Sequence, residues 1–478
     1  MAEAAAISSF EAKSQGDIDL NELIPVDPLV KFGTLPNGFK YYIRKNDQPK
    51  KRAELKLAIK IGSIFEKEHE RGIAHMIEHL AFRATKESKD EFETIRELEK
   101  HGVRFGAHQN AYTSFDETVY ELHIPTDVDG LLDDSLKILR QLALEVRLSD
   151  EDVEKERGIV VEEWRASQGG HQRAGEAYFE MVTEGCLYCK RLPIGLMSVI
   201  ENVPPEVVRK FYNEHYHPSL MAIIVCGDFE DMNQTIETIK TTFGGCTKAG
   251  PVPARPAGAA ALPEPGPGAR PRAGVFRDPE LTRASVSLEF VRPARKVRTA
   301  GEYRGLLQSE VFHACLQNRL NKLALTPDPP FLNANVCSQE ICAALASDVV
   351  SAAPQEAKVL GALGTLWREI ERVRRFGFAP REVEIAKANL AADTRSCYLE
   401  RNSTDSDVLA SELKDLFLNE VPAPGAEYEY FIGLKLLEGI SIQEVNAYVR
   451  HLETARNCVV HAKVPAARRG GPGALARR

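Results

Sequence analysis

Apolar and polar residues alternate along stretches of the first half of the chain, and this period predicts β-strands. The clearest stretch is ELKLAIKIG, where one face would carry Leu55, Leu57, Ile59 and Ile61. Before it, LPNGFKYYI places an Asn-Gly pair between two apolar runs, as in a hairpin turn. We expect further strands at ETVYELHIP and at the apolar run LMAIIVCGDF, with long helices between them.

The second half of the chain shows a similar order of elements. ASVSLEFV alternates through Val286, Leu288 and Phe290, and helical patterns follow over 306–325 and 358–375. A repeated order of strands and amphipathic helices indicates two related units. We therefore predict an α+β fold of two similar domains, each an antiparallel-rich sheet with helices packed on one face.

The boundary between these domains is predicted from composition. Residues 249–274 are rich in Pro, Gly and Ala and have almost no large apolar side chains, which is typical of a semi-extended linker. This places an N-terminal extension at 1–29, a first domain at 30–248 and a second domain at 275–463. The last stretch, 464–478, has a similar bias and is predicted to be a low-complexity, disordered tail.

The helical run RGIAHMIEHLAF concentrates polar side chains on one face. Successive residues of a helix turn by about 100°, so His75, Glu78 and His79 lie together, while the opposite face carries Ile73, Ile77 and Leu80. Two imidazoles one turn apart can bind one zinc ion, and the carboxylate beside them can take a proton from a zinc-bound water. The pattern also arises by chance in roughly a few chains per hundred, so a third ligand is needed.

The run DVEKERGIVVEEWR offers that ligand. On a helix Glu156 and Glu163 lie within about 20° of each other, inside an apolar stripe formed by Val153, Ile159, Val160 and Trp164. A buried carboxylate needs a cation, which is either a metal or an Arg or Lys in an internal salt bridge. Because the HMIEH helix also needs a ligand, we predict that His75, His79 and Glu163 bind Zn²⁺, one ion per chain, and that Glu162 faces solvent.

With these motifs the sequence resembles the pitrilysin/insulinase family of zinc metallopeptidases of the HxxEH type. HMIEH matches the zinc motif of the family, and the spacing of Glu156 and Glu163 matches its downstream element. RLPIG and FYNEHYHPSL match as well, and within the family the likeness is strongest to bacterial insulinase-like zinc proteases and to stromal processing peptidase. The resemblance implies Glu163 as third ligand, Glu156 as an outer carboxylate, and an edge strand where Asn110, Ala111 and Tyr112 meet the substrate backbone.

The resemblance also implies that the two domains form one half of a clamshell, in which the second domain is inactive. We expect a zinc-dependent endopeptidase, with Glu78 as general base, that cleaves unfolded peptides or targeting segments. The alternative is a non-catalytic structural or partner subunit of a processing-peptidase-like complex. A second half is expected to close the chamber, as a homodimer or as a heterodimer with a related chain. Arg319 is a candidate for the arginine that grips the substrate in this family.

Composition and charge narrow the remaining function classes. The formal net charge of -8 and the lack of a basic stripe argue against nucleic acid as the main partner. No apolar run is long enough to span a membrane, and the N-terminus does not read as a transit peptide, so the cytoplasm is favoured, with a plastid or mitochondrion as the alternative.

Other candidate ligands are weaker. The nine cysteines are interpreted as mostly reduced thiols, and the CxxC of Cys186 and Cys189 as coincidental. The pair His215 and His217 is expected to lie in a surface loop rather than to bind a metal.

Overall fold

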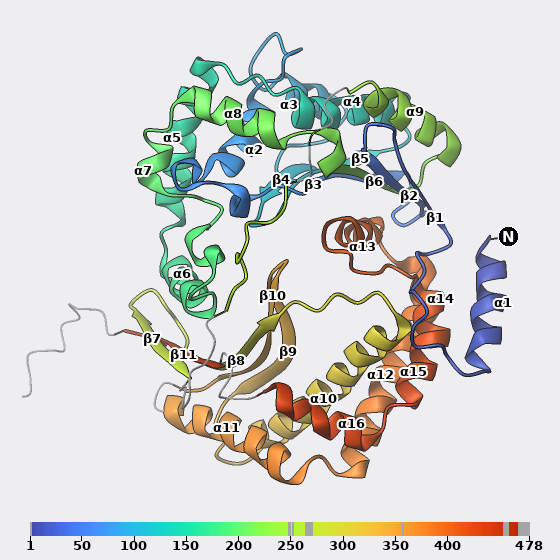
Figure 1. Cartoon of the computed structure of the whole chain (residues 1–478), viewed down its shortest axis with the longest axis vertical. Coiled ribbons are helices and arrows are strands. Elements are labelled where there is room, and N and C mark those ends of the chain that lie inside the picture. Colours follow the sequence, from blue (N-terminus) through green and yellow to red (C-terminus); the bar gives the residue numbers. More distant parts are fainter. Residues whose placement is uncertain are drawn as a thin grey trace, which may run out of the picture.

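Figure 1 shows a computed structural model in which the two predicted domains lie one above the other. It describes residues 2–246, 250, 253–262, 271–355, 358–452 and 458–466. The first sheet has the strand order β1-β2-β6-β3-β5-β4. Its strands are β1 (Val30–Thr34), β2 (Lys40–Lys45), β3 (Arg52–Ile59), β4 (Gln109–Thr113), β5 (Thr118–Pro125) and β6 (Met221–Gly227). Neighbours are antiparallel except β2 and β6, which are parallel.

The predicted strands of the first domain are confirmed, because the alternating apolar residues face a helical layer. Leu55, Leu57 and Ile59 are fully buried against that layer, and the Asn37-Gly38 pair lies in the β1–β2 turn, where Gly38 has a φ of 87°. The helices of this domain are α2 (Ile73–Arg83), α3 (Glu93–Glu99), α4 (Leu131–Leu144), α5 (Asp150–Ser167), α6 (Gly170–Val182), α7 (Met197–Ile200), α8 (Pro205–His215) and α9 (Met232–Gly244).

The second sheet has the strand order β7-β11-β8-β10-β9. Its strands are β7 (Arg272–Asp278), β8 (Ser285–Pro293), β9 (Asn333–Cys342), β10 (Leu345–Ala353) and β11 (Cys458–Pro465). The helices are α10 (Ala300–Ala324), α11 (Val359–Phe376), α12 (Pro380–Glu400), α13 (Ser406–Asn419), α14 (Ala426–Tyr428), α15 (Leu434–Glu438) and α16 (Ile442–Ala447). As predicted, the buried faces of β8 and α10 share one core, which includes Val286, Leu288, Val311 and Leu316.

The predicted repeat is visible in the topology. Strands β2-β6-β3-β5-β4 correspond in order to β7-β11-β8-β10-β9, and in both sheets the first pair is parallel while the following pairs are antiparallel. After β3 come α2, the short α3, a hairpin, α4 and α5, and after β8 come α10, a hairpin, α11 and α12. Helices α2, α4 and α5 therefore correspond to α10, α11 and α12, and α3 has no counterpart in that order.

Each sheet was predicted to carry helices on one face, but helices of the other domain also cover part of its second face. Helix α13 of the second domain packs Leu409, Leu413 and Phe417 against the first sheet, and it lies directly below that sheet in Figure 1. Conversely, α6 of the first domain packs against β7 and β11, and Tyr178 donates a hydrogen bond of 2.7 Å to Glu289. Each domain therefore lends one helix to the other.

The segments outside the two domains are partly packed. Within the N-terminal extension, α1 (Ala2–Ser14) places Phe10 against Tyr428, with ring centroids 5.5 Å apart. The predicted linker is packed in part, over residues 253–262. Ala259 is buried between the domains, and its carbonyl accepts a hydrogen bond from the backbone of Leu187. Backbone hydrogen bonds, small side chains and Leu262 provide this packing. Residues 467–478 of the predicted tail lie outside the described residues.

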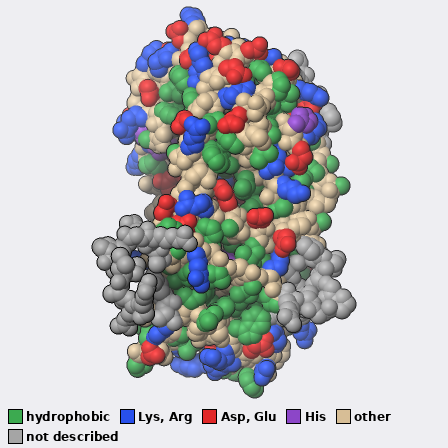
Figure 2. All heavy atoms as spheres, turned by 90° about the vertical axis from the view of Figure 1, so that its left-hand side faces the viewer, with side chains coloured by type: hydrophobic (Ala, Val, Ile, Leu, Met, Phe, Trp, Pro, Cys, Tyr) green, Lys and Arg blue, Asp and Glu red, His purple; other side chains and the backbone are tan. Residues whose placement is uncertain are grey.

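The face shown in Figure 2 carries basic and acidic side chains side by side over the first domain. Apolar side chains gather lower on this face, toward the second domain. Among the exposed apolar residues of that domain are Val275 of β7 and Leu360 of α11. In the described part of the chain, no helix has the length and hydrophobicity needed to cross a membrane.

Candidate active site

The histidine-bearing helix α2 is held at its N-terminus by a buried carboxylate. Glu66 accepts hydrogen bonds from the backbone N–H groups of Gly72 and Ala74, at 2.9 and 2.8 Å. These N–H groups have no partner within the helix, so the carboxylate completes the first turn. The opposite face of the helix buries Ile73 and Ile77 as predicted.

The motif RLPIG has a physical role at the same helix end. Gly195 lies so close to Gly72 that a Cβ at position 195 would be 2.3 Å from the Cα of Gly72. Both glycines have positive φ, 83° and 102°, which other residues rarely adopt. The backbone of this loop therefore packs directly on the start of α2 and fixes its position.

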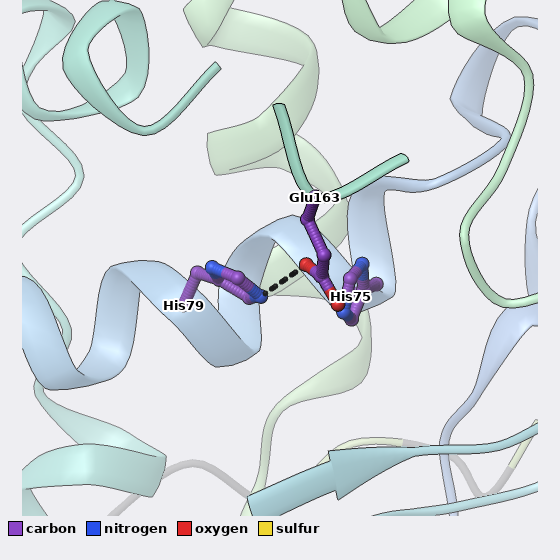
Figure 3. Close-up of side chains that lie close together, drawn as sticks. All are labelled: His75, His79 and Glu163. Carbon is purple, nitrogen blue, oxygen red and sulfur yellow. Dashed lines mark ion pairs between the residues drawn. The ribbon is translucent and has the colours of Figure 1, made fainter. Parts of the chain in front are cut away.

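Three of the predicted site residues converge in space. One ligand atom each of His75, His79 and Glu163 lies within 4.8 Å of the others, and this is the one such cluster found among the described residues. His79 Nε2 is 3.2 Å from Glu163 Oε2, and His75 Nε2 is 3.7 Å from the same oxygen. Figure 3 shows both rings on α2 and the carboxylate of α5 pointing toward them.

Glu156 lies behind this cluster rather than in it. Its Oε1 is 3.1 Å from His79 Nδ1, and its Oε2 accepts a hydrogen bond of 2.6 Å from Arg83 Nε. Because Glu156 holds Nδ1, the Nε2 atom of His79 is directed at Glu163. Arg83 was not singled out from the sequence, although it lies one helical turn after His79 and could have been found by that spacing.

The apolar stripe predicted on α5 is only partly correct. Val153, Glu156 and Val160 are buried, but Ile159 is 44% exposed and the Glu163 side chain is 47% exposed. The first turns of α5 pack against α2, whereas the turn that bears Glu163 reaches beyond the core. The carboxylate thus lies at an open edge, where a ligand from solvent can reach it.

The electrostatics of the cluster favour a cation. Burial and the neighbouring His79 lower the pKa of His75 to about 4, so its imidazole is neutral at pH 7. Burial opposes protonation of His79, but its hydrogen bonds to Glu156 and Glu163 outweigh burial and raise its pKa to about 10. Without a metal, a proton on His79 compensates the two carboxylates, and a metal ion can replace that proton.

The donor set fits zinc. Two imidazole Nε2 atoms and one carboxylate oxygen form the three-protein-ligand set that catalytic zinc sites use. Glu156 supplies the hydrogen-bonded carboxylate that orients a zinc-bound histidine from behind. Their role as ligands stays a prediction, and the geometry agrees with it.

Glu78 lies on the same helix and is connected to the edge strand. Its Oε2 accepts a hydrogen bond of 2.6 Å from Thr113 Oγ1 on β4. Burial raises the pKa of the Glu78 carboxyl, which suits a group that accepts and returns a proton near neutral pH. Thr113 was missed at the level of sequence, because nothing local links it to a residue 35 positions earlier.

The predicted substrate-contact residues lie on β4, at the edge of the first sheet. Asn110 is exposed, whereas Ala111 and Tyr112 are half-buried. Ala111 faces the helical layer, and Tyr112 faces α13 on the other side. Because Thr113 of β4 is hydrogen-bonded to Glu78, the strand lies beside this carboxylate, and the contact of Asn110, Ala111 and Tyr112 with a substrate stays a prediction.

The weaker candidates lie elsewhere. His217 is 2% exposed, and its Nδ1 lies 2.8 Å from Ser219 Oγ, so the surface-loop prediction is wrong for this residue. The turn after α8 leads directly into the buried strand β6, which takes His217 into the core. Cys186 and Cys189 are free thiols and belong to no metal cluster of the described residues.

Arg319 is engaged inside the second domain. Its Nε and Nη2 both donate hydrogen bonds of 2.7 Å to the Glu382 carboxylate, and Nη2 also donates to the carbonyl of Gly377. The guanidinium that was considered for substrate binding therefore links α10 to α12.

Comparison with known proteins agrees with the geometry. Residues 41–198 match the insulinase peptidases, family M16, and residues 202–390 match the domain described as the peptidase M16 inactive domain. The zinc protease PQQL-like of Arabidopsis thaliana is 36% identical over 445 residues, which cover 93% of this chain and 43% of that protein. The chloroplastic stromal processing peptidase of Oryza sativa subsp. japonica is 26% identical over 415 residues, which cover 75% of this chain and 32% of that protein.

A solved structure agrees in fold over nearly the whole chain. The first half of the periplasmic protease PqqL from Escherichia coli superimposes with a TM-score of 0.86 at 25% identity, with 93% of both chains covered. The chain spans less than half the length of the two curated relatives. Taken with the two matched domains, these likenesses show that the chain belongs to the insulinase family of peptidases, family M16.

Proposed function

We propose that this chain is a zinc-dependent endopeptidase of the HxxEH type. The observation that carries the proposal is the convergence of His75, His79 and Glu163, with Glu78 beside them on the same helix. The names of the relatives support this, since zinc proteases and processing peptidases are among them.

The residues of the chain would divide the reaction between them. A bound zinc ion would supply a Lewis acid for the scissile carbonyl and acidify a water molecule. Glu78 accepts the proton of the attacking water and later donates it to the leaving amine. Thr113 holds the Glu78 carboxylate toward β4, and Glu156 with Arg83 keeps the ring of His79 in place.

The substrate class proposed is an unfolded peptide, such as a targeting segment. An edge strand such as β4 recognises the backbone of an extended chain by adding it to the sheet. Only a segment without its own secondary structure has backbone N–H and C=O groups free for this pairing. A folded protein would have to unfold locally first.

The test is cleavage of a quenched unfolded peptide, together with the zinc content of the purified protein. Glu78→Gln should retain zinc and reduce kcat by at least about 100- to 10,000-fold, the range typical of general acid–base groups. The matched control is Glu162→Gln, whose exposed carboxylate pairs with Arg165, and it should cleave normally. Cleavage that is unchanged in Glu78→Gln contradicts the mechanism. Zinc retention without any cleavage by the wild type would favour the non-catalytic partner subunit instead.

We also propose that a second two-domain unit completes the molecule, either another copy or a related chain. The chain corresponds to the first half of a protease whose full structure is about twice as long. An open edge strand such as β4 is prone to aggregate unless it is covered. Light scattering during size exclusion should give about twice 53.0 kDa, or activity should appear only when the partner is added. An active, monodisperse monomer contradicts this proposal and leaves the zinc site untouched.

A further inference from the structure

The edge strand β4 depends on side-chain contacts for its order. Within the described residues its one neighbour in the sheet is β5, over a register from Gln109 to Thr113. On its other edge Gln109 alone has backbone partners, the N–H of Gly106 and the carbonyl of Arg104, while the stretch from Asn110 to Thr113 has none among the described residues. A strand held on one side frays more readily than a central strand. Binding a peptide to a frayed edge requires ordering the strand first, which weakens affinity.

Side chains fix β4 from both of its faces. On the helical side, Thr113 is bound to Glu78. On the opposite side, Lys414 Nζ donates a hydrogen bond of 3.1 Å to the hydroxyl of Tyr112 and lies 5.7 Å from the centre of its ring. The Tyr112 hydroxyl is in turn 3.4 Å from Glu117 Oε1, at the start of β5. Lys414 thus reaches the edge strand across roughly 300 residues of sequence.

Lys414 is well placed to act as a fixed support, because α13 is anchored along its length. Leu409, Leu413 and Phe417 are buried against the first sheet. Near its start, Asp407 forms an ion pair of 2.8 Å with Lys56 of β3. At its end, Glu420 is paired with Lys296 at 3.0 Å and with Arg298.

The charge of Lys414 is also accounted for locally. Its side chain is mostly buried, and the carboxylate of Asp415 lies 3.2 Å from Nζ. The ammonium therefore keeps its charge, and one of its protons is directed at Tyr112. Methionine at this position would fill similar space but could not donate a hydrogen bond.

We propose that Lys414, supplied by the second domain, positions the edge strand β4 through Tyr112 so that a substrate peptide can add to it. The inference rests on the proposed peptidase function, but it assigns a task to the domain described as inactive. Within the described residues Lys414 contacts Tyr112 and Asp415 and reaches neither Glu78 nor the proposed metal ligands, so it is a positioning residue and not a catalytic one.

The first test measures peptide cleavage and peptide binding. Lys414→Met should raise KM about three- to tenfold, as expected from the cost of ordering side chains at an interface, and leave kcat and zinc content nearly unchanged. Lys414→Arg, which keeps a donor, should restore KM. Affinity for a fluorescent unfolded peptide, measured in the Glu78→Gln background, should fall by the same factor, and this readout is valid even if the wild type does not cleave.

The second test measures hydrogen exchange of the amides of residues 109–113. Lys414→Met should exchange faster there. Lys56→Met is the matched control, since it breaks another bond between α13 and the first sheet without touching β4. Tyr112→Phe should reproduce the effect, and adding Lys414→Met to it should change nothing further. Unchanged peptide affinity in Lys414→Met, or an equal loss in Lys56→Met, overturns the proposal. Absence of cleavage in the wild type, with these binding shifts intact, would count against the peptidase function alone.

Discussion

Two corresponding helix pairs, α2 with α5 and α10 with α12, neutralise a carboxylate on the second helix with different cationic groups on the first. In the first domain, His79 lies between the carboxylates of Glu156 and Glu163. In the second domain, Arg319 of α10 forms two hydrogen bonds with Glu382 of α12. Both pairs thus join a cationic group on the first helix to a carboxylate on the second.

The difference lies in what else can occupy each place. A guanidinium is always charged and holds a carboxylate in a rigid geometry with two hydrogen bonds. In the second helix pair the cation is therefore fixed, and a metal ion cannot take its place. Imidazoles can lose their protons and bind a metal, and Glu163 is open to solvent. In the first helix pair a metal ion can therefore replace the proton on His79. The corresponding pairs of helices thus form a structural clamp in the second domain and the proposed metal site in the first.

The largest effect on the difference between the two helix pairs should come from removing the proposed third zinc ligand, Glu163. Glu163→Gln takes a charged oxygen from the metal cluster, so zinc affinity should fall by more than the roughly 10- to 100-fold typical of outer carboxylates. Glu162→Gln, one position earlier and exposed, should change affinity little. Competition with a chromophoric chelator measures both, and the reverse order would show that the helix register is wrong.

Glu156→Gln should have a smaller effect on the same measurement. The amide can still accept from Arg83 but no longer carries the charge that orients His79, so zinc affinity should fall about 10- to 100-fold. A loss as large as that of Glu163→Gln would mean that Glu156 is itself a ligand.

Breaking the clamp in the second domain should affect stability alone. Arg319→Met leaves Glu382 half-buried without its partner, which should lower the free energy of unfolding by about 1–2 kcal/mol. Arg165→Met, whose guanidinium and whose partner Glu162 are both exposed, is the control and should cost little. Denaturant melts measure both variants. A raised KM in Arg319→Met, with normal stability, would instead support a role in gripping the substrate.

The smallest effect, on thermal stability, is expected at Glu412 of α13, the helix of the second domain that packs on the first sheet. Burial, followed by the nearby Glu429, raises its pKa to about 7. Because the folded state holds this proton more tightly than the unfolded state, stability falls as pH rises from about 4.5 through 7. Glu412→Gln should therefore raise Tm by about 2–4 °C at pH 8 and much less near pH 5. An equal shift at both pH values would exclude this cause.

Local patterns in the sequence were sufficient to predict the strands of the sheets and the helix that carries His75 and His79. Leu55, Leu57 and Ile59 alternate because they face one layer, and His75 and His79 share a face because a helix turns by about 100° per residue. Both features depend on neighbours within a few positions.

Contacts across long separations could not be found in this way. The apolar residues of α13 predict an amphipathic helix, but nothing in them specifies the sheet of the other domain as their partner. Nothing near Thr113 in the sequence indicates that it binds Glu78. Nor could the packed part of the linker be predicted, because its hydrogen bonds use backbone groups that every residue has.

The late position of α13 in the chain affects how the protein is made. Its residues lie roughly 190 positions after the end of β6, which at about 5–20 residues per second takes the ribosome roughly 10–40 s to translate. During that time the face of the first sheet that bears Ala58, Ala222 and Ile224 has no helix to cover it. The nascent first domain therefore passes through a stage with an apolar face open to chaperones or to other chains.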